Sequence, residues 1–274
     1  MKPKKKAIGI FLIMLIITII RANAQTREMQ NLFRDLEKKA ESEKTNTDEA
    51  DPVLEQFVKS SRESVAGTLP LILHEASNPH VSVRGIAALA LFEIATRPDG
   101  QALLSTETAT FAALLVDTDI PIRRITGLAL ANLHLNDTSP LLTNLEAYLS
   151  REDATSTIGG GVAGLLMKAA PDNAESSDAI VRYMGRKDHT AISRSEMLQS
   201  IKVTRNQNRE IGKAVVNWAD GPDEQTSVHA IRTLQGMGKD VLRDSQQDLS
   251  RIAADSSRAP SVRTAATKAV FAVQ

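Results

Sequence analysis

The strongest constraint on the fold is a short pattern that recurs along most of the chain. Each copy begins with two residues, the first of them usually apolar, and the second member falls at positions 84, 123, 159, 193, 226 and 263. The steps between copies are therefore 39, 36, 34, 33 and 37 residues. A repeat of this length is typical of stacked helical pairs, each of which buries its apolar side only against its neighbours.

The columns of this repeat fit one face of a helix. Five residues after the first member stands a small residue in five of six copies, and nine residues after it stands an apolar residue in all six. These positions share one broad helical face, and small residues in its middle allow two helix axes to approach closely. The first members, apolar in five of six copies, are Val83, Ile122, Ile158, Ile192, Gln225 and Val262.

A further helix is predicted before each of these, so that each unit reads as helix, short turn, helix. Proline stands just upstream of four repeated helices, at positions 79, 121, 222 and 260. The first turn of a helix tolerates proline because that N–H has no partner within the helix. No segment alternates apolar and polar residues as a strand would. The intervening helices are expected at about 69–76, 107–116, 140–149, 176–184, 209–218 and 240–254.

This pattern resembles the HEAT-repeat family in its compact, HEAT-like form. The resemblance covers residues 53–274 and is best in NPHVSVRGIAALAL, which starts at Asn78, and PSVRTAA, which starts at Pro260. It implies an all-α, right-handed α-solenoid of about six stacked antiparallel helix pairs that serves as a binding scaffold. The middle copies depart from the family pattern, since Gly159, Ser193 and Thr226 stand where it has arginine.

Residues 1–24 have the features of a secretory signal peptide. Lysines at positions 2, 4, 5 and 6 precede an uncharged run of 14 residues, and Ala22-Asn23-Ala24 follows as a cleavage pattern. Cleavage near Ala24 predicts an exported protein, periplasmic or extracellular. The run is shorter than the roughly 20 apolar residues of a membrane span, but an uncleaved signal anchor is the alternative.

Residues 25–52 are expected to form an N-terminal amphipathic helix and a polar linker. Apolar residues recur at helical spacing between Arg27 and Lys44, whereas residues 41–52 have almost nothing to bury. The helix either docks loosely on the rest of the chain or is offered to a partner, and the sequence leaves both interpretations open.

Charge and composition exclude several functional classes. The chain has 33 basic and 33 acidic residues, but residues 1–24 hold five bases and no acid, so the remainder carries 28 − 33 = −5. A mildly acidic protein lacks the basic footprint that nucleic acids and anionic lipid surfaces need, and neither is expected as a partner. The absence of cysteine excludes disulfides, thiolate metal sites and a cysteine nucleophile.

No motif in the sequence predicts catalysis, a cofactor or a metal site. Gly159 to Gly164 fits G-x-G-x-x-G but lacks the preceding strand of a dinucleotide site. We interpret it as the start of a closely packed helix, and three successive glycines there predict a locally frayed turn. The five histidines do not pair on one helix face, and Asp117-Thr118-Asp119 lacks the later glycine and glutamate of a calcium loop. We therefore expect a protein that is not an enzyme.

Five arginines are the candidate functional residues, because they stand at or beside the starts of the repeated helices. They are Arg84, Arg123, Arg124, Arg194 and Arg263. They form either an anion-binding stripe for a partner or a ladder of bridges between neighbouring repeats, a role that suits the planar guanidinium. The apolar Phe271-Ala272-Val273 predicts in addition self-association through the C-terminal helix pair.

Taken together, these features predict an exported, non-catalytic scaffold that binds a protein or peptide partner on its solenoid surface. Two alternatives stay open. One is a HEAT-like enzyme of the lyase type, since some HEAT-like proteins resemble bilin lyases. The other is a membrane-tethered adaptor, which requires that the signal is not cleaved.

Overall fold

The computed structural model describes residues 31, 34, 65–133, 135 and 137–273. Within these ranges every regular element is a helix and none is a strand. The predicted signal peptide and the predicted helix and linker at 25–52 lie outside the described residues, except for Asn31 and Arg34, which are helical and exposed. Among the described helices, none combines the length and the apolar character that a membrane crossing requires.

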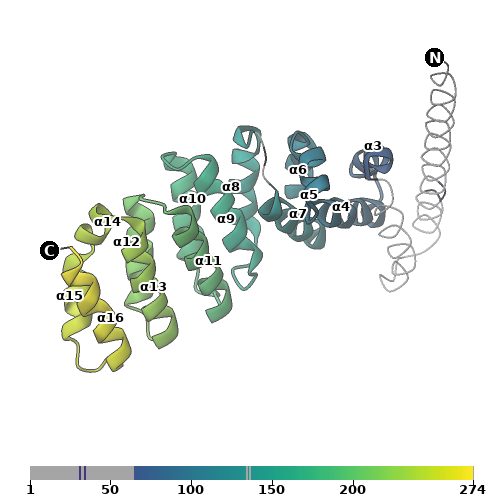
Figure 1. The fold of residues 1–274 in the computed structure, drawn as a ribbon. Helices are drawn as coiled ribbons and strands as arrows, with labels where there is room; N and C mark the ends of the chain where they lie inside the picture. The colour runs from purple at the N-terminus through teal and green to yellow at the C-terminus, as the bar shows by residue number, and fades with distance from the viewer. Residues whose placement is uncertain (1–30, 32–33, 35–64, 134, 136, 274) are drawn as a thin grey trace, which may run out of the picture. The chain divides into compact units, whose positions relative to one another are not determined.

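The described helices form two compact units, one reaching Leu135 and the other beginning at Asn136 (Figure 1). The first unit contains α3 (Val65–Glu75), α4 (Val81–Ala95), α5 (Pro98–Leu104), α6 (Thr108–Leu115) and α7 (Ile120–Asn132). The second contains η2 (Ser139–Leu141), α8 (Leu142–Arg151), α9 (Ile158–Ala169), α10 (Ala174–Met184), α11 (Ala191–Thr204), α12 (Arg209–Ala219), α13 (Glu224–Met237), α14 (Lys239–Asp244), α15 (Gln246–Ala254) and α16 (Pro260–Phe271).

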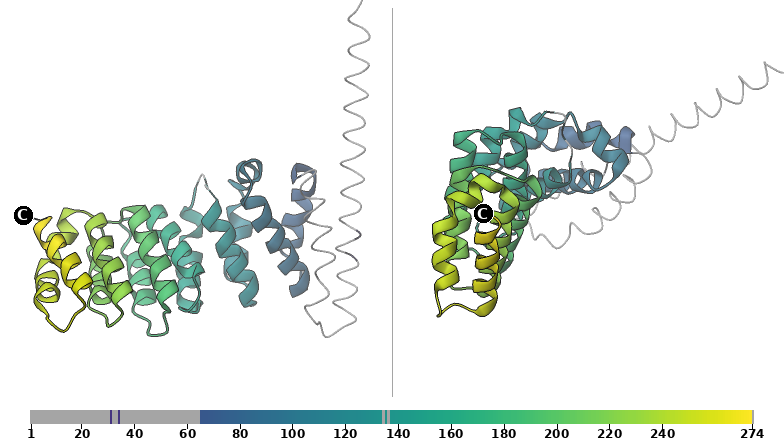
Figure 2. Two further views of the ribbon diagram at one scale, coloured as in Figure 1. Left: turned by 60° about the horizontal axis from the view of Figure 1, so that its bottom comes forward. Right: turned by 60° about the vertical axis from the view of Figure 1, so that its left-hand side comes forward.

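Within the second unit, the second helices of successive pairs pack side by side in chain order. Helix α9 packs on α11, α11 on α13 and α13 on α16, while α8 packs on α10 and α10 on α12 in a parallel row of first helices. Both rows are visible in Figure 2. In the first unit, α4 packs on α7 in the same way. The prediction of an all-α repeat solenoid is confirmed.

Short polar side chains determine where several helices begin. At the starts of α7, α11 and α13, the side chains of Asp119, Thr190 and Asp223 accept a hydrogen bond from the backbone N–H three residues later. Asn173 and Asn208 cap α10 and α12 in the same way. Each such cap contributes about 0.5–2 kcal/mol, so these helix starts are encoded locally in the turns.

Two segments differ from the sequence prediction. The structure adds α5, which begins at Pro98, and its Gly100 is packed so closely that a Cβ there would lie 2.1 Å from the carbonyl oxygen of Ile94. The single helix expected over 240–254 is instead the pair α14 and α15, which meet at Ser245. The Ser245 hydroxyl donates to the Val241 carbonyl at 2.8 Å, and such local bonding competes with regular helix.

The glycine run at the start of α9 brings this helix close to α10 and α11. A Cβ on Gly159 would lie 2.0 Å from the hydroxyl oxygen of Tyr183. A Cβ on Gly160 would lie 2.9 Å from the α11 backbone, where Glu196 joins Met197. Both glycines are buried in regular helix, so the predicted frayed turn is wrong. Tertiary packing outweighs the low helix propensity of glycine here.

Replacing Gly160 with alanine is expected to lower the free energy of unfolding by about 1–3 kcal/mol, because the new Cβ meets a backbone that cannot rotate away. Gly85→Ala in α4 is the matched control, since a Cβ there would meet only Ile122 Cγ1, at 3.9 Å. That variant should be as stable as the parent or gain up to about 1 kcal/mol of helix propensity. Chemical denaturation measures both, and equal losses would contradict the close approach of α9 and α11.

Candidate functional site

Four of the five candidate arginines occupy the same position in their helices. Each stands four residues after the N-cap position, the last residue before the helix, of α4, α7, α11 or α16. These four are Arg84, Arg123, Arg194 and Arg263, and Arg124 falls one position later. The shared position gives each guanidinium the same starting point relative to the turn before its helix.

The register of the sequence alignment is wrong in the third, fourth and fifth copies, and in the third Gly159 stands only two residues after the N-cap residue Thr157. The alignment put Ser193 and Thr226 in the arginine column, but both are buried and lie one position before it. Arg194 therefore belongs to the column, and Ser227 holds the place of arginine in α13. The apolar residue used for the alignment in the fourth copy, Ile192, is 66% exposed, so apolar character alone misplaced the helix.

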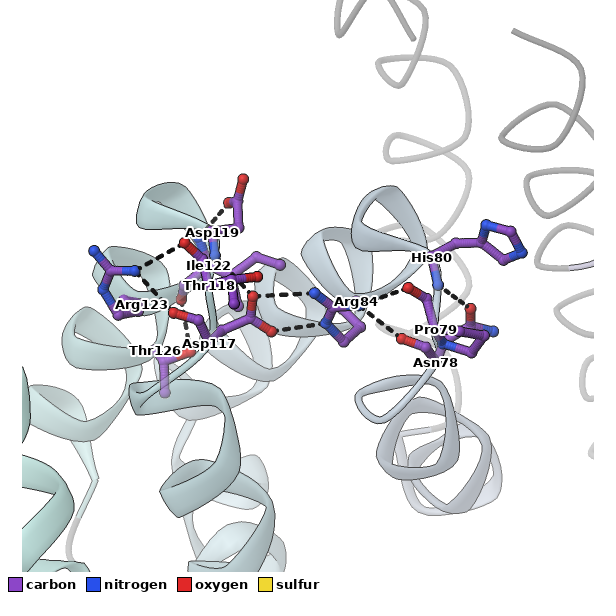
Figure 3. Close-up of polar contacts among 10 residues, drawn as sticks. All are labelled: Asn78, Pro79, His80, Arg84, Asp117, Thr118, Asp119, Ile122, Arg123 and Thr126. Carbon is purple, nitrogen blue, oxygen red and sulfur yellow. Dashed lines mark hydrogen bonds and ion pairs between the residues drawn. The ribbon is translucent and has the colours of Figure 1, made fainter. Parts of the chain in front are cut away.

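Arg84 connects the turns of two consecutive repeats (Figure 3). Its Nε donates to Asp117 Oδ2 at 2.7 Å and its Nη2 donates to Oδ1 at 3.1 Å. Its Nη1 donates to the carbonyls of Asn78 and Pro79, in its own turn, at 2.9 and 3.0 Å. The two charged side chains are only 17% and 7% exposed. A bidentate pair with so little solvent contact is among the stronger charged interactions in proteins.

The bridge shifts the pKa of both partners. Burial by itself would raise the pKa of the Asp117 carboxyl, but hydrogen bonds from Arg84 and from the Asp119 backbone, together with the charge of Arg84, lower it overall. The hydrogen bond to Asp117 raises the pKa of Arg84. Asp117 also accepts from the Asp119 N–H at 2.9 Å, and Asp119 caps α7. Both acids of this turn therefore stabilise the turn and its bridge.

Arg123 repeats only the contacts that Arg84 makes within its own turn. Its Nη1 donates to the carbonyls of Asp117 and Thr118 in its own turn, at 2.8 and 3.1 Å. Its Nε is buried and has no hydrogen-bond partner among the described residues, and the same holds for the Nε of Arg194 and of Arg263. Equivalent positions in the repeat thus carry different sets of contacts.

Two arginines that the sequence analysis missed connect turns of successive repeats. They do so in the third and fifth copies, where glycine or serine occupies the arginine position of the helix. Arg186, in the turn after α10, donates to the carbonyl of Glu152 before α9. Arg258, just before α16, donates to the carbonyl of Gly221 before α13 and, at 2.6 Å, to Asp220 Oδ1. In both cases the donor comes from the following repeat. The only sequence signal was the loss of arginine from the third and fifth copies.

His189 lies in the core of the second unit, edge-on to two aromatic rings. Its ring centroid is 4.9 Å from that of Tyr183 and 5.2 Å from that of Trp218. Its Nε2 donates to the Tyr183 carbonyl at 2.8 Å, and its Nδ1 lies 3.2 Å from Ser193 Oγ. Burial lowers the pKa of His189 although the bond to Tyr183 acts in the opposite sense, and the charge of Arg194 adds to the lowering. His189 is thus a core residue whose neutral form is favoured by burial.

Two adjoining grooves run between the second helices of the second unit. One, of about 190 Å³, lies between α11 and α13 and is lined by residues that include Ile192, Glu196 and His229. The other, of about 660 Å³, lies between α13 and α16 and includes His229 and Arg232. His229 lines both, and its Nδ1 lies 3.3 Å from Ser195 Oγ. None of the five candidate arginines lines either groove.

A third groove, of about 390 Å³, lies on the side of the first helices, between α12 and the pair α14 and α15. Its charges are paired with one another. Arg209 Nε lies 3.1 Å from Asp244, and Arg251 Nη2 lies 2.9 Å from Asp220. No group of three histidine, aspartate or glutamate side chains in the described part of the chain is arranged to hold a metal ion.

Comparison with solved structures identifies the fold. An archaeal HEAT-like repeat protein from Thermococcus onnurineus NA1 matches with a TM-score of 0.55 and 15% identity, over 84% of this chain and 98% of that one. A designed armadillo repeat protein matches with a TM-score of 0.50 and 14% identity, over 75% and 100% of the two chains. This chain has a HEAT- and armadillo-like helical repeat fold. No protein-family model and no curated protein matches the sequence.

Asp117→Asn should lower the free energy of unfolding by about 1–3 kcal/mol at neutral pH, because Arg84 loses its charged partner in a partly buried site. The pKa of Asp117 is lower in the folded than in the unfolded chain, so the carboxylate stabilises fully above its ordinary value of 3.8 and less as the pH falls through the folded pKa.

Urea unfolding at a series of pH values measures this difference. The free energy of unfolding of the parent protein should exceed that of the variant at neutral pH, and this difference should disappear in acid. Asp137→Asn is the control, because among the described residues Asp137 accepts a hydrogen bond only from the Ser139 backbone N–H, at an exposed turn. A difference between parent and Asp117→Asn that stays constant down to the acid limit would contradict the bridge.

Proposed function

We propose that this protein is an exported, non-catalytic repeat scaffold that binds a protein or peptide partner on the second helices of residues 136–274. The observation that carries the proposal is the pair of grooves that meet at His229. Their linings combine apolar groups, such as Ile192 and Val228, with side chains that hydrogen-bond, such as Gln225 and Ser261. A peptide presents both apolar side chains and backbone amides, and such a surface suits both.

The stacked helices support this proposal because they hold the surface in place before binding. Ile192 and Gln225 project from helices whose opposite sides are buried in the core, at Leu198 and Ile231 for example. A surface held in this way loses little conformational entropy when a partner binds. The similar solved structures are described as repeat proteins, which accords with a scaffold.

A photo-crosslinking residue in place of Gln225, which lines both grooves, should capture one reproducible protein in the native host. The same residue in place of Lys213, on the first-helix side, is the control and should not capture it. The N-terminal residue of the crosslinked product reports export, since Gln25 means cleavage and Met1 means a membrane-tethered adaptor. Capture of the same protein from both positions, or from neither, would refute binding at the second helices.

Self-association through the C-terminal helix pair is the second part of the proposal. Phe271 is 65% exposed at the end of α16, and a second copy would cover it.

Phe271→Ser should therefore shift the protein toward the monomer in analytical ultracentrifugation. We expect the dissociation constant of the dimer to rise by about tenfold or more, because a buried phenylalanine contributes roughly 1.5–3 kcal/mol. Leu128→Ser, at another exposed apolar position, is the control and should leave the distribution unchanged. A parent protein that stays monomeric at high concentration would rule out this contact.

A further inference from the structure

Each second helix of the second unit carries one exposed cation in its C-terminal half. We call these four residues the cationic row; they are Lys168, Lys202, Arg232 and Lys268. None of them forms an ion pair with a residue that the structure describes, although such pairs are frequent elsewhere in the same unit. Because α9, α11, α13 and α16 pack in order, the row crosses the whole second-helix side of this unit.

The cations of α12 and α15, on the first-helix side, have partners, whereas Arg151 in α8 and Arg182 in α10 form no ion pair with a described residue. Lys213 Nζ lies 2.8 Å from Glu210, Arg209 Nε lies 3.1 Å from Asp244 and Arg251 Nη2 lies 2.9 Å from Asp220. The cations of α12 and α15 and those of the cationic row are all exposed, so solvation alone does not explain why the former are matched by carboxylates and the latter are not. The cationic row is therefore a local excess of positive charge on a chain whose net charge is not positive.

Two members of the row, Lys202 and Arg232, both act on His229. The stem of Lys202 reaches α13, where its Cγ lies 3.6 Å from the position of a Cβ on Gly236. Burial lowers the pKa of His229, and the charges of Lys202 and Arg232 lower it further, whereas Glu196 acts in the opposite sense. Glu196 stands nearer the N-terminus of α11, so the positive potential belongs to the C-terminal half of this face.

Arg205 extends the row at the end of α11 and has an unusual backbone. Its φ is 50°, and it is the only residue other than glycine with a positive φ in the described part of the chain. Glycine is strongly favoured at such a position because it has no Cβ. The Arg205 side chain is exposed. An exposed arginine at a position that favours glycine adds charge to the row at a cost in backbone strain.

We propose that the cationic row binds an acidic, extended peptide segment of the partner protein. This inference rests on the proposed function and names the chemistry of the partner. Neighbouring packed helices lie about 10 Å apart, and a peptide in the extended polyproline II conformation has three residues per turn and advances roughly 3.1 Å per residue. A segment with a carboxylate at every third residue thus places all its carboxylates on one side and presents about one to each helix. Opposite charges of matched spacing provide specificity and fast association.

The test uses a labelled peptide of about twelve residues with glutamate at every third position, a length that spans the four helices. Fluorescence anisotropy measures its binding to the purified protein. The row variant carries Lys168→Gln, Lys202→Gln, Arg232→Gln and Lys268→Gln, and it should bind at least about tenfold more weakly. Binding by the parent protein should also weaken as salt is added.

The matched control removes the same charge from the first-helix side. It carries Arg209→Gln, Lys213→Gln, Arg243→Gln and Arg251→Gln, and its affinity should stay within about twofold of the parent, because exposed ion pairs contribute little to stability. Circular dichroism checks that both variants are folded. Equal weakening of the two variants, or no binding by the parent, would overturn the acidic-peptide proposal. Equal or tighter binding of RNA or of anionic vesicles would overturn it as well.

Arg205→Gly separates binding from folding. The variant should unfold at a higher temperature, because glycine relieves the left-handed strain, and it should bind the acidic peptide about twofold or more weakly. A variant that is more stable and binds unchanged would remove Arg205 from the site. If the peptide fails while crosslinking at position 225 still captures a partner, the acidic chemistry is wrong and the proposed function stands.

Discussion

Lateral packing between consecutive helix pairs is the interaction on which the rest of this structure depends. Helices α9 and α11 approach so closely that Gly160 has no space for a methyl group against the α11 backbone. One helix pair cannot bury its own apolar side, so each pair is stable only beside the next. The row of second helices, and the grooves between them, exist because of this packing.

The turns are held together by arginines whose positions in the sequence vary. Arg84 reaches forward to Asp117, whereas Arg186 and Arg258 reach back to carbonyls of the preceding repeat. The need is the same in each case, because turn carbonyls at the ends of packed helices require donors. A long side chain with several donors meets this need from more than one position, which explains why the arginine column is incomplete.

Charge is distributed unequally between the two sides of the second unit. The cations of α12 and α15 pair with carboxylates on the same side, as Lys213 does with Glu210. Cations on the second helices, such as Lys202 and Arg232, have no ion-pair partner in the described part of the chain. A basic residue near a helix C-terminus is favoured by the helix dipole, which accounts for Lys202 but not for the absence of matching acids. The acidic-peptide proposal depends on that difference.

The repeat length, the helical periodicity and the turn residues determined the fold class and most of the helices. They did so because apolar spacing and capping side chains act within a few residues of one another, as Asp119 does for α7. The N-terminal predictions for residues 1–24 and 25–52 stay predictions, since these residues, apart from Asn31 and Arg34, lie outside the described ranges.

Only the tertiary structure decided the register of the third, fourth and fifth copies, the break at Ser245 and the contacts of each candidate arginine. In each of these cases the outcome depends either on contacts with residues distant in sequence or on which of several local hydrogen bonds forms. Ile192 is apolar and yet 66% exposed, and the bridge between Arg84 and Asp117 spans 33 residues. The grooves at His229 and the cationic row likewise form only when the repeats stack, because their residues come from different helices.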